Sequence, residues 1–276
     1  MNNFWTRTLT GTVFVAVMIG GIWWSYWSMA VLFFVIVVLG LWEFYSLIER
    51  KGFNPRKLLG VALGISVFSF FVTASRLMDH YIIAFGLGTL FLSVILVVTE
   101  LFLRAENPFA NIAFGFFGIL YIAVPFALLT VPVCEGGLVS PYRYLPNSLL
   151  GYFFLLWAND TFAYLVGRGI GKTKLFERIS PKKTWEGTIG GILCAQGIAY
   201  LLSIYFTELP LRDWMVVGAM VSVFGTLGDL VESMFKRSLG VKDSGTILPG
   251  HGGILDRFDG VFLSAPFVVT YIELMH

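Results

Sequence analysis

Acidic and basic residues gather between positions 229 and 259, in a chain where only 13% of the 276 residues are charged. Three cations, Lys236, Arg237 and Lys242, precede a Gly-His-Gly-Gly turn, and Asp-Arg-Phe-Asp follows at 256–259. Lysine and arginine suit phosphate groups, and carboxylates about one helical turn apart suit a divalent cation. Placing charge at a membrane boundary costs free energy, so charged residues found there often have a function. The pattern therefore predicts a site for a phosphorylated, metal-bound substrate at a membrane surface.

Carboxylates also occur at the ends of three apolar runs that could be membrane helices. Asp160 lies in one run, Asp229 in a second, and Asp256 with Asp259 at the entry to the last. Hard oxygen ligands from separate helices, completed by phosphate oxygens, predict a magnesium site for phosphoryl transfer. If the second run is helical, four polar residues share one face by their spacing. They are Asp229, Glu232, Ser233 and Lys236.

Other polar positions leave alternatives open. Asp160 either faces a cavity or partner, or belongs to an interhelical hydrogen bond in which Asn159 or Thr161 takes part. His251 could bind phosphate, act as an acid or base, or simply occupy a turn, and its neighbouring glycines would let the backbone approach a ligand closely. Glu43, inside an apolar run, and Glu100, at the end of another, favour structural roles.

A basic loop between 167 and 187 is a further candidate for phosphate binding. Residues 167–174 read Gly-Arg-Gly-Ile-Gly-Lys-Thr-Lys, but Val166 stands where a phosphate loop needs its first glycine, so that fold is rejected. Ser180, followed by proline, resembles a capped helix start, and Lys182 with Lys183 would make that helix N-terminus an anion site. The alternative is that these cations only fix topology or contact anionic lipid.

The composition indicates a polytopic membrane protein. Hydrophobic residues make up 57% of the chain, and several apolar runs reach the roughly 20 residues needed to cross a bilayer. Cys134 and Cys194 lack the spacing of metal ligands, so we interpret them as small buried hydrophobic residues. The first run shows no convincing cleavage site, so we expect it to remain as a span. The nine expected spans are 9–27, 28–48, 58–75, 81–101, 109–132, 147–167, 188–206, 214–234 and 258–274.

Fold class, domain organisation and orientation follow from these spans. We expect an all-α polytopic bundle of about nine membrane helices, with the active site at their cytoplasmic ends. Residues 1–132 would form about five scaffold and lipid-facing helices, and 133–276 a catalytic region of about four helices with cytoplasmic loops 168–187 and 235–257. All but three of the 19 Lys and Arg residues then lie on one side. The positive-inside rule therefore places the N-terminus in the cytoplasm and the C-terminus outside.

The polar pattern of the C-terminal half resembles a known family. It reads Ser233-x-x-Lys236-Arg237-x4-Lys242-Asp243-x-Gly245-x-x-Leu248-Pro249-x-His251-Gly252-Gly253-x-x-Asp256-Arg257-x-Asp259, which is similar to the signature of phosphatidate cytidylyltransferases, the CDP-diacylglycerol synthases. Upstream residues from Asn159 to Gly187 also resemble the family, so the similarity spans about 150–262. The resemblance implies a membrane nucleotidyltransferase of phospholipid biosynthesis that converts CTP and phosphatidic acid to CDP-diacylglycerol and pyrophosphate.

The resemblance also implies roles for individual residues. The metal ligands would be Asp229, Asp256 and Asp259, with Asp160 next. The other catalytic residues would be Lys236, Arg237, Lys242 and His251. The substrate-binding residues would be Asp160, Lys172, Ser180, Lys182, Lys183, Thr184, Ser233, Asp243 and Arg257. The expected cofactor is Mg²⁺, with a second cation of unknown identity as an alternative.

The implied setting is the lipid bilayer of a bacterial cytoplasmic membrane, with CTP and phosphatidic acid as substrates and no nucleic acid partner. A homodimer stays open, because the small-residue spacing of Gly187 and Gly191 permits close helix packing within or between subunits. The rival interpretations are a CTP-dependent polyprenol kinase or ether-lipid cytidylyltransferase, an anion transporter and a scaffold protein. A transporter needs polar residues along a path to both faces, whereas here they crowd one side.

Overall fold

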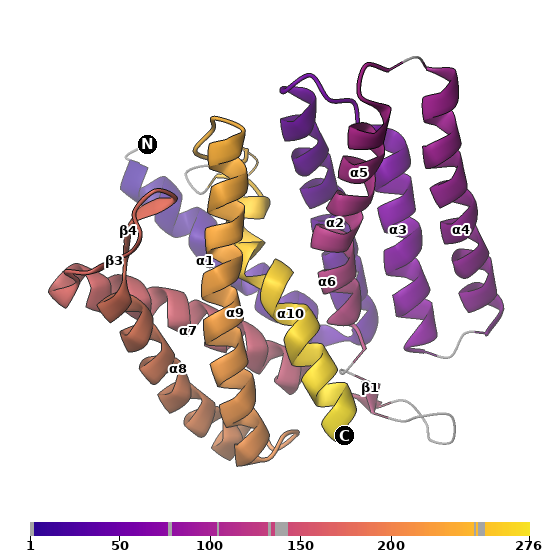
Figure 1. Cartoon of the computed structure of the whole chain (residues 1–276). Coiled ribbons are helices and arrows are strands. Elements are labelled where there is room, and N and C mark those ends of the chain that lie inside the picture. Colours follow the sequence, from indigo (N-terminus) through magenta and orange to yellow (C-terminus); the bar gives the residue numbers. More distant parts are fainter. Residues whose placement is uncertain are drawn as a thin grey trace. The chain divides into compact units, whose positions relative to one another are not determined.

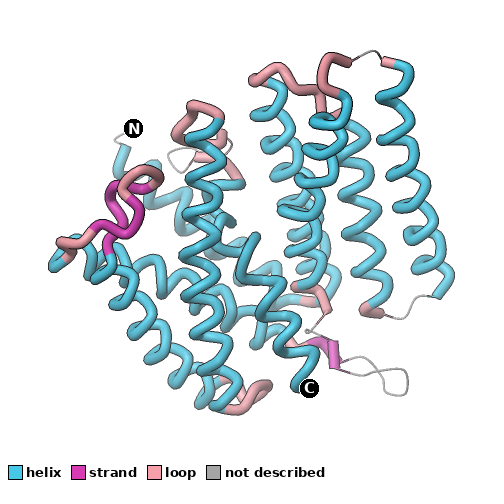
Figure 2. The backbone as a smooth tube through the Cα atoms, in the orientation of Figure 1, coloured by secondary structure: helices cyan, strands magenta, loops and turns pink. Residues whose placement is uncertain are grey.

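Long apolar helices make up most of the chain in the computed structural model (Figure 2). It describes residues 3–76, 79–103, 105–131, 134–135, 143–245, 247 and 252–276. The helices of the N-terminal half are α1 (Asn3–Trp24), α2 (Tyr26–Glu49), α3 (Lys57–Ala74), α4 (Asp79–Phe102), α5 (Pro108–Gly118) and α6 (Val124–Leu128), with a π-helical turn, Ile119–Ala123, between the last two. Those of the C-terminal half are α7 (Pro146–Ile170), α8 (Trp185–Tyr205), α9 (Leu211–Ser238) and α10 (Leu255–Met275).

Among the described residues, eight helical stretches are long and apolar enough to cross a membrane, with the stretch from α5 to α6 counted as one. The apolar part of α1, Thr8–Trp24, is shorter. Each of the nine runs expected from the sequence is therefore mostly helical in its described part, and the predicted all-α polytopic architecture is confirmed. Within the described residues, strands occur only in two hairpins, β1 (Cys134–Glu135) with β2 (Arg143–Tyr144) and β3 (Lys174–Phe176) with β4 (Ser180–Thr184).

The chain divides into two compact units. The first contains Met1–Tyr144 together with Asp243–Arg257, and the second contains Leu145–Lys242 together with Phe258–His276. The described residues of the segment 243–257 thus group with the N-terminal helices, although they lie far along the chain. The functional division at residues 132 and 133 that the sequence suggested stays a prediction.

In the first unit, α2 supplies much of the buried core. Phe33, Phe44 and Tyr45 are fully buried, and the Tyr45 hydroxyl donates a 2.6 Å hydrogen bond to the carbonyl of Gly115. An added Cβ at Gly60 or at Gly118 would lie 2.6 or 2.8 Å from the Tyr45 ring, so these glycines make room for it. The ring therefore fixes α2 against α3 and α5.

In the second unit, α7 and α8 pack closely along a line of small residues. A Cβ at Gly191 would lie 2.8 Å from the Asn159 carbonyl oxygen, and one at Gly187 would lie 2.6 Å from the Ala163 carbonyl oxygen. The small-residue spacing on α8 thus serves packing within this chain. In Figure 1 the two helices diverge from the β3–β4 hairpin that joins them.

The expected helix start at Ser180 is wrong. Residues Ser180–Thr184 form β4, which pairs antiparallel with β3, and α8 begins four residues later than the capping pattern implied. Thr184 is the N-cap, because its side-chain oxygen accepts a 3.2 Å hydrogen bond from the Gly187 amide. Lys182 and Lys183 therefore lie on a strand and not in the first turn of a helix.

Candidate functional site

Four carboxylates of the second unit come from three helices. Asp160 is on α7, Asp229 and Glu232 are on α9, and Asp259 is on α10. The Asp259 carboxylate lies within electrostatic reach of the other three, and we call these four residues the acidic cluster. An added Cβ at Gly228 would lie 2.5 Å from the Asp259 carbonyl oxygen, so this glycine lets α9 approach α10 closely.

Two lysines supply positive charge to the acidic cluster. The Lys183 ammonium lies 2.5 Å from Asp229 Oδ2, and the Lys236 ammonium lies 2.5 Å from Glu232 Oε2. The Ser233 hydroxyl donates a 3.2 Å hydrogen bond to Asp229 Oδ1. The predicted polar face of α9 is therefore confirmed, and the basic strand β4 contributes a cation to it.

Residues at the start of α8 hold the backbone at the beginning of the β3–β4 hairpin. The Glu186 carboxylate accepts hydrogen bonds of 3.1 Å from the amides of Lys172 and Thr173, and the Trp185 amide donates to the Thr173 carbonyl at 2.9 Å. The side chains of Lys172 and Lys182 are exposed. The hairpin thus presents cations to the surroundings from a fixed backbone, as an anion-binding element would.

The first unit holds a second group of carboxylates around residues 244–256. Asp256 Oδ2 accepts hydrogen bonds from the Ser244 amide at 3.0 Å, the Ser244 hydroxyl at 2.9 Å and the Gly253 amide at 2.8 Å. Glu43 Oε2 accepts from the Ile254 amide at 2.9 Å, and Glu43 Oε1 accepts from the Leu255 amide at 3.3 Å and from the Ser244 hydroxyl. Asp256 is therefore tied to backbone and to Ser244, and Ser244 to Glu43.

The remaining predicted residues have different surroundings. Lys242, Asp243 and Arg257 are exposed, and Arg237 donates a 3.1 Å hydrogen bond to the Val241 carbonyl. Asp160 is also exposed. Its neighbour Asn159 is buried, and Asn159 Nδ2 lies 3.4 Å from Thr226 Oγ1 on α9. The alternative of an interhelical hydrogen bond thus applies to Asn159. The predicted residue His251 lies outside the described residues.

The sequence pattern did not single out Ser244, and it favoured a structural role for Glu43, which agrees with the hydrogen bonds that this carboxylate accepts. The signal for Glu43 was its position, because it is the sole charged residue of the 28–48 run. Ser244 carried no signal beyond its place in the polar segment. Glu100 is structural, as expected, because it pairs with Arg56 at 2.5 Å and accepts a 3.1 Å hydrogen bond from Asn111.

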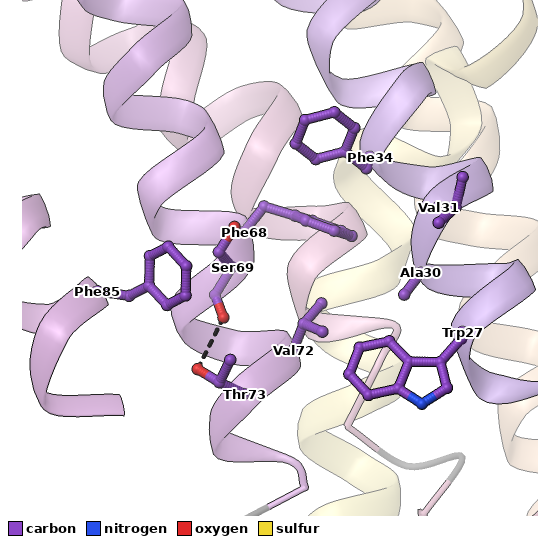
Figure 3. Close-up of a pocket in the computed structure, with 9 residues that line it drawn as sticks. All are labelled: Trp27, Ala30, Val31, Phe34, Phe68, Ser69, Val72, Thr73 and Phe85. Carbon is purple, nitrogen blue, oxygen red and sulfur yellow. Dashed lines mark hydrogen bonds between the residues drawn. The ribbon is translucent and has the colours of Figure 1, made fainter. Parts of the chain in front are cut away.

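A cavity of about 240 Å³ lies among α2, α3 and α4 in the first unit (Figure 3). Trp27, Phe34, Phe68 and Phe85 form much of its wall. The Thr73 hydroxyl donates a 2.8 Å hydrogen bond to the Ser69 carbonyl within α3. The lining carries no charged group, so this cavity lacks the chemistry that the polar segments offer.

Metal binding stays a prediction. Within the part of the chain that the structure describes, no group of three or more His, Cys, Asp or Glu side chains lies close enough to hold an ion. Asp229 and Asp259 belong to the second unit and Asp256 to the first. The oxygen donors of the acidic cluster are nevertheless of the type that Mg²⁺ prefers.

The fold and these polar groups define a helical integral membrane protein whose charged side chains collect at helix ends and on a basic hairpin. Residues 5–275 match the model of the Cytidylyltransferase family, and the chain belongs to that family.

Curated relatives are similar over part of their length. Phosphatidate cytidylyltransferase of Staphylococcus aureus (strain COL) is 43% identical over 162 residues, 58% of each chain. That of Staphylococcus haemolyticus (strain JCSC1435) is 40% identical over 179 residues, 64% of this chain and 65% of the relative. That of Staphylococcus epidermidis (strain ATCC 35984) is 40% identical over 183 residues, 66% of each chain. The matched region thus covers less than two thirds of these relatives.

Proposed function

We propose that the protein is a membrane nucleotidyltransferase that converts CTP and phosphatidic acid to CDP-diacylglycerol and pyrophosphate for phospholipid biosynthesis. The observation that carries the proposal is the family match across residues 5–275, together with relatives that are named phosphatidate cytidylyltransferase. The site supports it, because lysines and carboxylates lie side by side on α9 and β4. Polyanionic substrates need such positive charge for binding.

The reaction joins a lipid phosphate to a nucleotide. A phosphatidate oxygen attacks the α-phosphorus of CTP, the bond to the β-phosphate breaks, and pyrophosphate leaves. Such transfers depend on positioning and charge neutralisation more than on covalent chemistry. Lys182 and Lys183 on the hairpin, Lys236 and Arg237 on α9, and the other predicted cations would hold the phosphates. The remaining ones are Lys172, Lys242 and Arg257.

The carboxylates fit a divalent cation by their chemistry. Asp229 already attracts a cationic group, since the Lys183 ammonium lies 2.5 Å from its Oδ2 atom. We assign Asp229, Asp256 and Asp259 as the ligands that would hold Mg²⁺, with Asp160 as a further one and a second cation left open. Bound magnesium would neutralise phosphate charge and stabilise the departing pyrophosphate.

The membrane setting suits these substrates, because the acyl chains of phosphatidic acid lie in the bilayer and CTP comes from the cytoplasm. We place the N-terminus and the basic hairpin in the cytoplasm and the C-terminus outside, in a bacterial cytoplasmic membrane. The support is the asymmetry of lysine and arginine among the loops. A homodimer remains an alternative for crosslinking in membranes to decide.

The testing experiment measures turnover of radiolabelled CTP with phosphatidic acid in detergent micelles, with and without Mg²⁺. We expect a magnesium-dependent cytidine product that partitions into organic solvent. Asp256→Asn should abolish this product, because it removes a charge that we assign to the metal site. The matched control is Glu49→Gln, which alters an exposed carboxylate 3.7 Å from Lys57 and should leave turnover unchanged.

Two results would overturn parts of the proposal. Folded wild-type protein that makes no cytidine lipid would point to another acceptor, which a panel of lipid phosphates and polyprenols would then identify. Near-normal turnover by Asp256→Asn would remove this residue from the catalytic set.

A further inference from the structure

Glu43 is a buried carboxylate in the C-terminal third of α2, the second apolar helix. Its exposed fraction is 5%, and the residues that follow it, Phe44 and Tyr45, are fully buried. Burying a charged or polar group in an apolar environment costs several kcal/mol unless hydrogen bonds compensate. The hydrogen bonds that Glu43 accepts should therefore indicate its role in α2.

Three groups that precede Asp256 in the sequence donate hydrogen bonds to Glu43. They are the amides of Ile254 and Leu255 and the hydroxyl of Ser244. The first amides of a helix have no partner within the helix, and negative charge is favourable beside them. Glu43 thus serves as a cap for α10 that is supplied by a helix about 200 residues away in the sequence.

Two glycines of the segment provide the space for this carboxylate. An added Cβ at Gly253 would lie 2.0 Å from Glu43 Oε1, and one at Gly245 would lie 2.7 Å from Glu43 Oε2. Gly252 has a φ of +85°, and its added Cβ would lie 2.5 Å from Asp256 Oδ2. These glycines of the signature therefore fit the backbone around Glu43 and Asp256.

We propose that Glu43 is a positioning residue of the nucleotidyltransferase site, which holds Ser244 and the start of α10 so that Asp256 keeps its orientation. Ser244 links the two carboxylates, because its hydroxyl lies within hydrogen-bonding distance of both. The effect on turnover rests on the proposed function. The N-terminal helices then contribute to the reaction and are more than a lipid-facing scaffold.

Glu43→Gln tests this role with little change in shape. Glutamine places an NH₂ group where a carboxylate oxygen accepts a hydrogen bond, so one donor of the segment loses its partner. The matched control is Glu100→Gln, which alters another buried carboxylate of the same unit, one that pairs with Arg56 and Asn111. Both variants are purified in detergent and compared by amide hydrogen exchange and by steady-state kinetics.

We expect Glu43→Gln to speed exchange of the amides of residues 252–257 and to lower kcat by about 10- to 100-fold, as loss of a residue that orients a metal ligand does. The KM for CTP should change little, because the cations that bind CTP are untouched. Glu100→Gln should leave both the exchange of 252–257 and kcat as in the wild type. Ser244→Ala should lower kcat less once Glu43 is already Gln, since the two residues act through one contact.

Unchanged exchange of 252–257 in Glu43→Gln would overturn the proposal, as would an equal loss of activity in both variants, which would indicate a general loss of stability. If wild-type protein makes no cytidine lipid, the proposed reaction is wrong. The exchange comparison then decides alone: faster exchange confined to 252–257 supports the positioning role, and no difference rejects it.

Discussion

Carboxylates in this protein differ in their hydrogen-bonding and ion-pair partners, and these partners suggest two kinds of role. Asp229 receives the ammonium of Lys183 and the hydroxyl of Ser233. Glu43 and Asp256 each accept hydrogen bonds from two backbone amides. A side-chain ammonium can leave and bind a phosphate instead, whereas a backbone amide is fixed by the fold. We therefore expect the group around Asp229 to change partners when substrate binds, and the group around Asp256 to keep them.

Replacing Lys183 by methionine tests the first expectation. The change keeps most of the side-chain volume but removes the cation that lies beside Asp229, so phosphate should bind and react less well. We expect kcat/KM for CTP to fall by about 100-fold, a loss typical of removing one group that stabilises transition-state charge. The control is Lys174→Met on the neighbouring strand β3, where the side chain is exposed. Equal losses in both variants would show that only the net charge of the hairpin matters.

At the scale of elements, close packing of α7 and α8 sets where the hairpin begins. The glycines of α8 bring its first turns against α7, and Thr184 caps α8 at the end of β4. Lys183 directly precedes this cap, so its position follows from the helix pair. A change in the spacing of α7 and α8 should therefore alter both the stability of the protein and the position of Lys183, which contacts Asp229.

Gly191→Val tests the importance of this packing. The added Cβ would lie 2.8 Å from the Asn159 carbonyl oxygen, so the helices must separate. Overpacking of this kind costs about 1–3 kcal/mol, which thermal unfolding in detergent would detect as a lower midpoint. Gly197→Val on the same helix is the control, since nothing lies within 4 Å of its added Cβ. Similar midpoints for the two variants would contradict the packing account.

The elements differ in how far the sequence could predict them. The face of α9 was predictable because Asp229 and Lys236 are related by helical spacing alone. The strand β4 was not, because serine followed by proline suits both a helix start and the beginning of an edge strand. Pairing with β3 decided between them. The contacts of Glu43 were also beyond the sequence, since its partners lie about 200 residues away.

At the scale of the whole molecule, the apolar runs predicted the helices well because about 20 apolar residues in a row are sufficient evidence for a span. Orientation in the membrane is a separate matter that rests on the distribution of cations. The helix α8 has 21 residues and is thus about 30 Å long, which separates the hairpin at its start from the turn at its end by the thickness of a bilayer.

Single cysteines on the two sides of α8 test the orientation. In a background without Cys134 and Cys194, Arg212→Cys should react with a membrane-impermeant maleimide in intact cells. Lys174→Cys should react only after the membrane is opened, because the hairpin is placed in the cytoplasm. The reverse pattern would place the hairpin outside, where CTP is absent, and would contradict the proposed reaction.

The hydrogen bonds that Ser244, Ile254 and Leu255 donate to Glu43 have a consequence for biogenesis. Ser244 follows Glu43 by 201 residues. At a synthesis rate of about 5–20 residues per second, the ribosome needs roughly 10–40 s to supply the groups that satisfy Glu43. During that interval α2 enters the membrane with its carboxylate lacking these partners. The N-terminal helices therefore complete their folding only after residues 244–255 have been synthesised, and premature termination before residue 243 would leave a membrane-inserted fragment that quality-control proteases can recognise.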